Sequence, residues 1–321
     1  MKAAIVREFG HPPSYGDFAD PDVRAGETAV IVRAAAANAL AVMRAAGTHY
    51  SAGTELPFVP GVDGAGRLAD GRKVYFGFVR PPFGSMAEKA SVPNAFCIPL
   101  PEGVDEATAA AAGNSGLSCW IPLTRRARIA PGESVLVNGA SGSAGRMAVQ
   151  VAKHLGAQKV IATGRNPGRL KLAAELGADV TLSLDQPPAA LREALRREAR
   201  DAKVGVVLDY LWGPSAEVLL DALGGPNAPR GSDRVRYVQV GSSSAPTIQL
   251  DGAKLRSSGV ELLGSGIGNS PHGDIVSSIT EFFQAFVAAR FRVDFEAQPL
   301  SAVEATWARV RGPTRIVFTV P

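Results

Sequence analysis

The chain has 321 residues, of which 46% are hydrophobic and 20% are charged, and its formal net charge is +4. This composition is typical of a soluble globular protein with two domains, and no apolar run reaches the roughly 18 residues that a membrane-spanning helix needs. The basic residues form no block interleaved with aromatic residues, so a nucleic-acid-binding surface is not expected.

Cysteine usage and the first residues indicate the compartment. Cys97 and Cys119 are distant in the sequence, so they form neither a disulfide framework nor the spacing of a zinc knuckle. The opening stretch, MKAAIVREFG, has too short an apolar part for a signal peptide, and an acidic residue follows at once. We therefore expect a cytoplasmic protein with no membrane or nucleic-acid partner.

The first third of the chain predicts short strands separated by glycine and proline. The strand candidates are the stretches AAIV, ETAVIVRAA, RKVYFGFV and MAEKASV. Only residues 40–46 and 106–112 have a helical pattern. We expect the first part of a mostly β domain over residues 1–117.

Residues 134–166 predict one dinucleotide-binding unit. An apolar strand at 135–137 leads into a glycine-rich turn. In the helical pattern that follows, Met147, Val151 and Leu155 repeat every four residues. A second apolar strand comes at 160–162. Strand, turn, helix and strand within about thirty residues is the size of one nucleotide-binding βαβ unit.

The glycine-rich turn carries the residue types that a pyrophosphate needs. It reads A-x-G-x-x-G from Ala140 to Gly145, in place of the usual G-x-G-x-x-G. A side chain at Gly142 would block an anion from the backbone amides at the helix start, and Gly145 lets the helix lie close to the sheet. The predicted cofactor contacts are Ser141, Gly142, Ser143, Ala144 and Gly145. The alternative is a purely structural turn.

The residues after the second strand predict which nucleotide is bound. An NAD site normally has an acidic residue about 20 positions past the glycines. Here Gly164, Arg165 and Asn166 follow the strand, and no carboxylate is near. Because a guanidinium can make paired hydrogen bonds to a 2′-phosphate, we predict NADPH and assign these three residues to its site. The alternative for Arg165 is a solvated side chain at a strand end.

Helices and strands alternate beyond this unit. Helices are expected at 167–176, 190–200 and 215–223, and strands at 180–184, 204–210, 235–240 and 260–263. This alternation predicts an α/β fold with a doubly wound parallel sheet, a Rossmann domain over residues 118–266. The glycine- and proline-rich stretch 224–233 is expected to be a mobile surface connection.

The last part of the chain changes pattern again. A helix is expected at 275–289, a shorter helix at 302–310 and a final strand at 316–320. The apolar face of the first helix consists of Ile275, Ile279, Phe282, Phe283 and Phe286. Residues 267–321 are therefore assigned to the mostly β domain, which both ends of the chain would build around the Rossmann domain.

Five motifs, spread over nearly the whole chain, match one known family. Residues 38–47 look like its N-P-x-D/E…R-x-G segment, and residues 56–66 look like L-P-x-x-P-G-x-D-x-x-G. Residues 99–104 and 114–120 look like V-P-L-P-D-G-L and N-x-G-L-T-A-W, and 140–145 match A-x-G-x-x-G. The chain thus resembles the medium-chain dehydrogenase/reductase superfamily, in its zinc-free, zeta-crystallin-like NADPH:quinone oxidoreductase branch. The resemblance implies a GroES-like catalytic domain with an inserted Rossmann domain.

The resemblance also implies that no metal is bound. The zinc enzymes of this superfamily use a cysteine and a G-H-E motif, and this sequence has Gly61-Val62-Asp63 at that place. The imidazole ligand and a four-cysteine lobe are both missing from the sequence, whereas zinc in enzymes needs three or four such ligands. A site assembled from the four scattered histidines is the less favoured alternative.

The activity implied by the resemblance needs no metal. A quinone or a conjugated enone is already electrophilic, so holding it over the nicotinamide can supply most of the catalysis. We expect an oxidoreductase that transfers a hydride from NADPH to a small hydrophobic quinone or α,β-unsaturated carbonyl. The alternatives are an NADPH-binding protein with little turnover, acting as a sensor or through a partner, and an enoyl-thioester reductase.

The resemblance further implies catalytic residues near the start of the chain. Asn38 would face the nicotinamide or the substrate, or else it fixes a local turn. Counting from Asn38, the family's cleft tyrosine falls on His49, with Tyr50 adjacent. We assign Tyr50 as the hydrogen-bond donor to the substrate carbonyl, with this register left open.

The remaining expected contacts follow the later strands. Ser118 stands where the family has a threonine near the cofactor, or it caps the helix that follows. The residues expected to border the nicotinamide ribose are Gly241, Ser242, Gly264 and Ser265. Two positions depart from the family, since Ala41 replaces an acid and Leu184 replaces a tyrosine. The strand at 260–263 is expected to pair across a homodimer, as it does in relatives.

Overall fold

The structure is a computed structural model that describes residues 1–49, 55–224, 234–312 and 314–321. It divides into two compact units. The β-rich unit consists of Met1–Asn114 with Ile279–Pro321, and the Rossmann unit is Ser115–Ser278. Tyr50 and residues 225–233 of the expected mobile connection lie outside the described residues.

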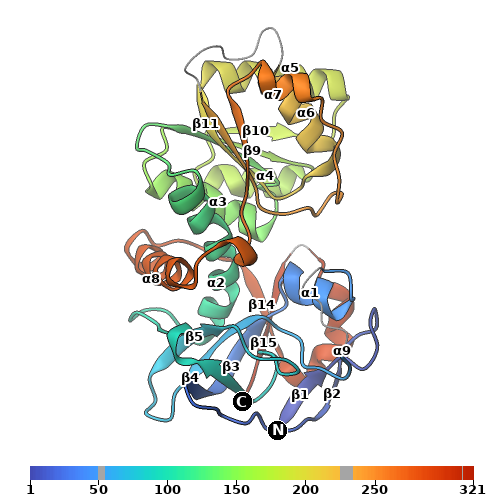
Figure 1. The fold of residues 1–321 in the computed structure, drawn as a ribbon, viewed down its shortest axis with the longest axis vertical. Coiled ribbons are helices and arrows are strands. Elements are labelled where there is room, and N and C mark those ends of the chain that lie inside the picture. The colour runs from blue at the N-terminus through green and yellow to red at the C-terminus, as the bar shows by residue number, and fades with distance from the viewer. Residues whose placement is uncertain (50–54, 225–233, 313) are drawn as a thin grey trace. The chain divides into compact units, whose positions relative to one another are not determined.

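The Rossmann unit contains a six-stranded parallel sheet (Figure 1). Its strands are β8 (Ser134–Asn138), β9 (Lys159–Gly164), β10 (Val180–Ser183), β11 (Val204–Asp209), β12 (Val235–Gln239) and β13 (Val260–Gly264). Their order across the sheet is β10-β9-β8-β11-β12-β13. Counted from β8, this is the 3-2-1-4-5-6 order of a doubly wound sheet, and the predicted fold is confirmed.

The helices of the Rossmann unit follow the predicted alternation. They are α3 (Ser143–His154), α4 (Pro167–Glu175), α5 (Pro188–Asp201), α6 (Gly213–Leu223) and the short α7 (Gly252–Arg256). The predicted helix is present as α3, and Gly156, at φ +86°, follows its end. Its burial shows no four-residue period, because every residue from Gly145 to Ala152 is buried and Leu155 lies one residue beyond the helix. The sequence did not predict α7, since five residues are too few to show a helical period.

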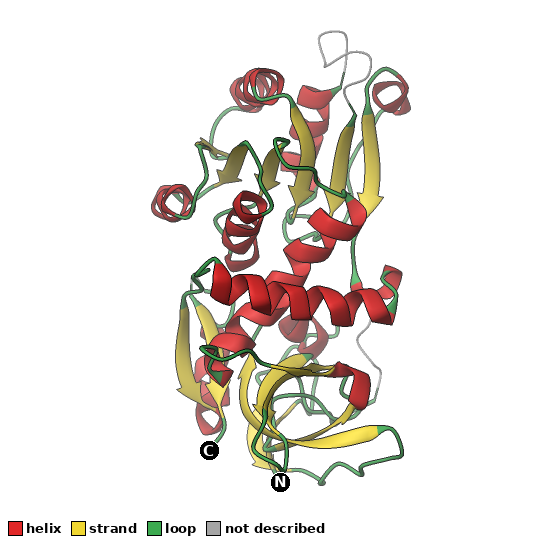
Figure 2. Ribbon diagram, turned by 90° about the vertical axis from the view of Figure 1, so that its left-hand side faces the viewer, coloured by secondary structure: helices red, strands yellow, loops and turns green. Residues whose placement is uncertain are grey.

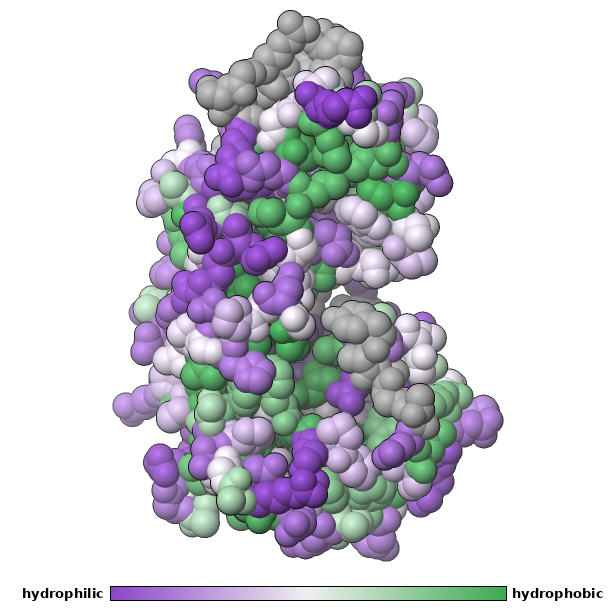
Figure 3. Space-filling view, in the orientation of Figure 1, coloured by the Kyte–Doolittle hydropathy of each residue, from purple (hydrophilic) through white to green (hydrophobic). Residues whose placement is uncertain are grey.

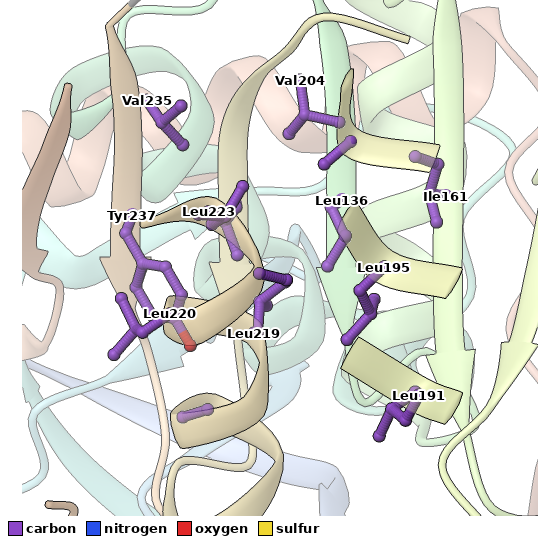
Figure 4. Packing of buried hydrophobic residues seen from close by; sticks show 14 residues of the cluster. Leu136, Ile161, Leu191, Leu195, Val204, Leu219, Leu220, Leu223, Val235 and Tyr237 are labelled. Atoms are coloured by element: carbon purple, nitrogen blue, oxygen red, sulfur yellow. The ribbon is translucent and has the colours of Figure 1, made fainter. Parts of the chain in front are cut away.

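The core of the Rossmann unit fixes how α5 and α6 lie on the sheet. Leucine side chains of the two helices face aliphatic residues and one tyrosine of the strands (Figure 4). The helix residues are Leu191, Leu195, Leu219, Leu220 and Leu223, and the strand residues include Leu136, Ile161, Val235 and Tyr237. Full burial of one such side chain stabilises the fold by about 1.5–3 kcal/mol, so this cluster holds α5 and α6 on the sheet.

The β-rich unit confirms that both ends of the chain build one sheet. Its strands are β3 (Glu27–Ala36), β4 (Asp63–Arg67), β5 (Lys73–Gly77), β6 (Lys89–Pro93), β7 (Cys97–Pro99), β14 (Phe295–Pro299) and β15 (Arg315–Thr319). The order is β14-β15-β3-β4-β5-β7, and β6 also pairs with β3. β15 lies antiparallel to β3, while β1 (Lys2–Ile5) and β2 (Ser14–Asp17) form a separate pair. Figure 2 shows strongly curved strands in the β-rich unit.

Four helices complete the described chain, namely α1 (Ala39–Ala45), α2 (Glu106–Ile121), α8 (His272–Ala288) and α9 (Val303–Thr306). The predicted apolar face of α8 is confirmed, since all five of its residues are buried. The helix expected at 302–310 is instead divided among two 3₁₀ turns and α9. In the part of the chain that the structure describes, no helix has the length and apolar character to cross a bilayer.

Helix α2 is much longer than the pattern predicted. The helix passes through Gly113, Asn114 and Gly116, which are poor helix formers. Gly113 has a packing reason, because a Cβ atom there would lie 2.5 Å from Cζ of Tyr75. Tertiary packing therefore keeps helical a segment that local propensity would end.

Candidate functional site

The carboxyl edge of the parallel sheet brings together most of the predicted cofactor residues. The glycine-rich turn follows β8, Arg165 and Asn166 follow β9, Gly241 and Ser242 lie just beyond β12, and Ser265 follows β13. In doubly wound sheets ligands bind at this edge, where the strand order reverses. Here that reversal falls between β8 and β11.

The glycine-rich turn presents backbone amides at the start of a helix. The N–H of Gly142 donates to the carbonyl of Gly139 at 3.2 Å, and α3 begins at Ser143. The N–H of Arg146 donates to the carbonyl of Gly142 at 2.9 Å. The amides of Ser143, Ala144 and Gly145 precede that bond, at a helix N-terminus that favours an anion.

Three glycines of this region have different surroundings. A Cβ atom on Gly145 would lie 2.6 Å from Cα of Ala140, so the close approach of α3 to the turn requires glycine. A Cβ atom on Gly164 would lie 2.9 Å from the Ser141 side chain, which packs over the end of β9. A Cβ atom on Gly142 would meet nothing nearer than the carbonyl oxygen of Gly139, at 3.6 Å. Packing within the protein therefore does not explain the glycine at 142, and a ligand would.

A buried polar network joins the carboxyl ends of β8, β9, β11 and β12. Asn138 Nδ2 donates to Asp209 Oδ1 at 2.8 Å, and Thr163 Oγ1 donates to Asn138 Oδ1 at 2.7 Å. The hydroxyl of Tyr237 donates to Asp209 Oδ2 at 2.7 Å. Burial and the charge of Asp209 raise the pKa of Tyr237 well above its ordinary value, so the phenol keeps its proton. This network was not predicted from the sequence, where its signal was polar residues at the ends of apolar strands.

The same carboxylate holds the turn after β11. Asp209 Oδ1 accepts hydrogen bonds from the N–H groups of Leu211 at 2.9 Å and Trp212 at 3.1 Å. Trp212 has φ +57° and ψ −159°, a conformation that suits glycine and costs of order 1–3 kcal/mol in another residue. Its side chain lines a pocket of about 320 Å³. The other lining residues are Gln239, Ser242, Pro246, Leu262, Leu263 and Gly264. Two predicted cofactor contacts, Ser242 and Gly264, thus share one pocket.

Arg165 and Asn166 lie at the exposed end of β9. Arg165 Nη2 donates to Oγ of Ser244 at 3.4 Å, from the loop after β12. Asn166 caps α4, since its Oδ1 accepts from the N–H of Arg169 at 3.0 Å. The side-chain oxygen of Asn166 is therefore used by the helix, and its N–H₂ group is the part suited to a phosphate.

Ser118 lies inside α2. Its hydroxyl donates to the carbonyl of Ser115 at 2.8 Å, and its own carbonyl accepts from the Tyr210 hydroxyl at 3.0 Å. The alternative that Ser118 caps a following helix is wrong, because α2 has already begun at Glu106. Its contact with the cofactor stays a prediction.

In the β-rich unit, Asn38 belongs to a second buried network. Asn38 is 2% exposed, and its Oδ1 accepts from the N–H of Ala41 at 2.9 Å, which caps α1. Asn38 Nδ2 donates to Asp63 Oδ1 at 2.7 Å, and the hydroxyl of Tyr75 donates to Asp63 Oδ2 at 2.8 Å. These contacts match the alternative in which Asn38 fixes a local turn, and its catalytic role stays a prediction. The sequence analysis did not single out Tyr75.

The electrostatics of this second network differ from those of an exposed carboxylate. Burial raises the pKa of Asp63 to about 6, although hydrogen bonds from Tyr75 and Asn38 and the charge of Arg315 oppose the shift. Burial and the Asp63 charge raise the pKa of Tyr75 well above its ordinary value. At His49, burial and the charge of Arg44 lower the pKa of the imidazole. Asp63 therefore changes charge within the range of neutral and mildly acidic buffers.

The described residues offer zinc no ligand set. Both carboxylate oxygens of Asp63, at the position of the G-H-E motif, accept hydrogen bonds from Asn38 and Tyr75. Within residues 1–49, 55–224, 234–312 and 314–321, no three His, Cys, Asp or Glu side chains come together in a way that could hold a metal ion.

Comparison with known proteins adds a family to this geometry. A family model described as zinc-binding dehydrogenase matches residues 144–284. Quinone oxidoreductase-like protein 2 of Mus musculus is 29% identical over 232 residues, covering 69% of this chain and 64% of that protein. The chain thus spans less than two thirds of the mouse relative's length. The probable NADPH-dependent quinone reductase tdiC of Emericella nidulans is 27% identical over 96% of both chains.

The fold has a solved counterpart at full length. The quinone oxidoreductase of Thermus thermophilus, determined alone and with NADPH, superposes with a TM-score of 0.83 and 26% identity, covering 100% of both chains. A doubly wound sheet inserted in a β-rich unit, with a glycine-rich turn at its switch point, defines a dehydrogenase-type fold. These similarities support the medium-chain dehydrogenase/reductase superfamily, in its quinone oxidoreductase branch.

Proposed function

We propose that this protein is an NADPH-dependent oxidoreductase that reduces a quinone or an α,β-unsaturated carbonyl without zinc. The observation that carries the proposal is Arg165 at the carboxyl end of β9, where an NAD site would have a carboxylate, beside the open glycine-rich turn. The name of the Emericella relative and the NADPH complex of the Thermus enzyme support it.

The residues at the sheet edge fit the parts of this cofactor. The amides of Ser143, Ala144 and Gly145 would hold the pyrophosphate. The Arg165 guanidinium and the Asn166 amide would hold the 2′-phosphate. The residues proposed to border the nicotinamide half are Ser118, Gly241, Ser242, Gly264 and Ser265. When bound, NADPH would supply the hydride.

The protein itself would bind and orient the reactants and exclude water from them. Leu262, Leu263 and Pro246 give the pocket beside Ser242 an apolar lining, which suits a small hydrophobic electrophile. We also propose Tyr50 as the hydrogen-bond donor to the substrate carbonyl. The side chain of Asn38 is hydrogen-bonded to Asp63 and to the start of α1. Asn38 would therefore act by holding α1, which precedes Tyr50 in the chain, in place.

The proposal includes a cytoplasmic homodimer. β13 is one of the two edge strands of the Rossmann sheet, and Leu262 on it is 38% exposed. On the face seen in Figure 3, hydrophobic residues gather over part of the Rossmann unit. An open strand edge with apolar side chains suits pairing with a second copy.

Binding of the two nucleotides tests the cofactor assignment. Titration of the protein with NADPH and with NADH, followed by tryptophan fluorescence, should show tight binding of NADPH alone. Arg165→Ala should weaken NADPH by about 10- to 100-fold, the value of hydrogen bonds to a charged group, and leave NADH unchanged. The control is Lys171→Ala, which removes an exposed basic residue of α4 and should change neither affinity.

The outcomes distinguish the proposed function from its alternatives. Equal affinities of the wild type for both nucleotides would make Arg165 a surface residue, and no binding of either would overturn the proposed function. Loss of NADPH absorbance on addition of a quinone or enone would distinguish an enzyme from a sensor. Faster turnover of enoyl thioesters than of free enones would favour the thioester alternative, and a rate lost on treatment with a chelator would contradict zinc independence.

A further inference from the structure

We propose that Asp63 is a positioning residue of this enzyme, whose carboxylate holds Asn38 and through it the start of helix α1. This inference rests on the proposed function, because α1 leads to the His49–Tyr50 position assigned to the substrate. Asp63 itself is 4% exposed, and its two oxygens accept hydrogen bonds within the β-rich unit. It would therefore act through Asn38 and not by touching substrate.

One side of the Asp63 carboxylate is fixed. Asp63 begins β4, whose register with β5 is set by backbone pairing from Asp63 and Gly77 onward. Tyr75, which donates to Oδ2, is held by Gly113 of α2 and by Phe283, whose ring centroid lies 5.3 Å away in an edge-on contact. The carboxylate is thus anchored by the sheet and by the buried phenol of Tyr75.

The other oxygen of the carboxylate, Oδ1, acts through Asn38 on helix α1, which has little stability of its own. α1 has only seven residues, and a helix this short is marginal by itself. Its side-chain cap is the bond from the Ala41 N–H to Asn38 Oδ1, and its first turn has no acidic residue. Because Asp63 fixes the Asn38 amide through Nδ2, it sets the orientation of this cap and supplies the negative charge that the first turn lacks.

The ionised state of Asp63 matters for this role. A hydrogen bond to a carboxylate is about twice as strong as one between neutral groups. The charged and titratable groups facing Asp63 are Tyr75 on β5 and Arg315 on β15, with the polar Asn38 on the third side. Since burial raises the pKa of Asp63 to about 6, lowering the pH from 7.5 to 5 converts the strong contact with Asn38 into a weaker one.

The test compares protonation with its chemical mimic, Asp63→Asn. For the wild type, kcat/KM for 1,4-benzoquinone should fall by about tenfold between pH 7.5 and pH 5, the difference between a charge-assisted and a neutral hydrogen bond. Asp63→Asn should show the low value at pH 7.5 and no bend near pH 6. Its Kd for NADPH should match that of the wild type, because the proposed cofactor contacts lie in the Rossmann unit.

Two further variants sharpen the comparison. Tyr75→Phe removes a hydrogen bond that lowers the pKa of Asp63, so the bend should move to higher pH. This variant also keeps the proposal testable if Asp63→Asn does not fold. Asp70→Asn makes the same substitution at an exposed carboxylate, paired with Arg72, and should keep the wild-type profile.

A readout independent of turnover follows Asn38 directly. The side-chain amide resonances of Asn38 should titrate near pH 6 in the wild type and stay constant in Asp63→Asn. A wild-type rate and bend in Asp63→Asn, or an Asn38 signal that ignores pH, would overturn the proposal. If the wild type turns over no quinone or enone, the proposed function fails, while the Asn38 resonances still decide whether Asp63 holds this segment.

Discussion

At the scale of single residues, Gly142 and Gly145 meet opposite surroundings although they lie in one turn. We predict that Gly145→Ala destabilises the fold by about 1–3 kcal/mol, because the new methyl group overlaps Ala140. Gly142→Ala should leave stability near that of the wild type and weaken NADPH, because its methyl group enters space that the protein leaves open. Urea unfolding and NADPH titration of both variants measure the two effects.

A different outcome would change the role of the turn. If Gly142→Ala bound NADPH as the wild type does, the cofactor would not approach the backbone at this point. If Gly145→Ala were as stable as the wild type, α3 would have room to shift away from β8. The two glycines serve as controls for each other, since each substitution adds the same methyl group.

The site residues proposed from the sequence are those whose spacing is local. The turn 140–145 and Arg165 stand out because glycines and a basic residue occupy fixed positions around one strand-helix-strand unit. The network of Asn38, Asp63 and Tyr75 did not stand out in this way. Its members are separated by 25 and 12 residues and meet only through sheet pairing. Nothing in the sequence states that these polar groups share one buried space.

At the scale of elements, the start of α4 serves both the fold and the proposed phosphate site. We predict that Asn166→Asp keeps the cap of α4, because aspartate and asparagine cap helices equally well. It should nevertheless weaken NADPH by repelling the 2′-phosphate, and NADH should bind as well as before or better. Thermal unfolding and titration with both nucleotides measure these changes.

The matched variant for this prediction is Asn166→Ala. It removes the cap without adding charge, so it should lose about 1 kcal/mol of stability. Its preference between the nucleotides should change less than that of Asn166→Asp. An unchanged NADPH affinity in Asn166→Asp would mean that the phosphate does not lie near the start of α4.

The elements that sequence reasoning missed have identifiable physical reasons. β4 reads Asp-Gly-Ala-Gly-Arg, which lacks the alternating β-branched pattern of a strand, and its glycines are required by close packing. A Cβ atom on Gly64 would lie 2.9 Å from the carbonyl oxygen of Ala34 on β3. In α2 the glycines instead suggest that the helix ends early. The helix continues through them, and Tyr75 packs on Gly113. In both cases a neighbour distant in the sequence decides the local structure.

At the scale of the whole molecule, the two units predict separate responses to a ligand. We predict that NADPH at about 100 times its Kd slows hydrogen exchange of β8, α3 and β9 by about 100-fold, because it binds the folded Rossmann unit. Exchange of β3, β4 and β5 should slow much less, since multi-domain chains need not unfold as one. Equal protection of both sets of strands would show that the units open together.

The pairing of β15 with β3 has a consequence for the order in which the protein is made. The Rossmann unit is one continuous segment, so the ribosome finishes it before the partner of Ala34–Ala36 exists. That partner emerges about 280 residues later, which is roughly 15 seconds to a minute at ordinary rates of synthesis. During this interval Ala34–Ala36 lack their partner strand and are open to wrong pairing, while residues 27–31 of the same edge can already pair with β6. The end of β3 therefore stays without its final partner until the whole Rossmann unit has been made.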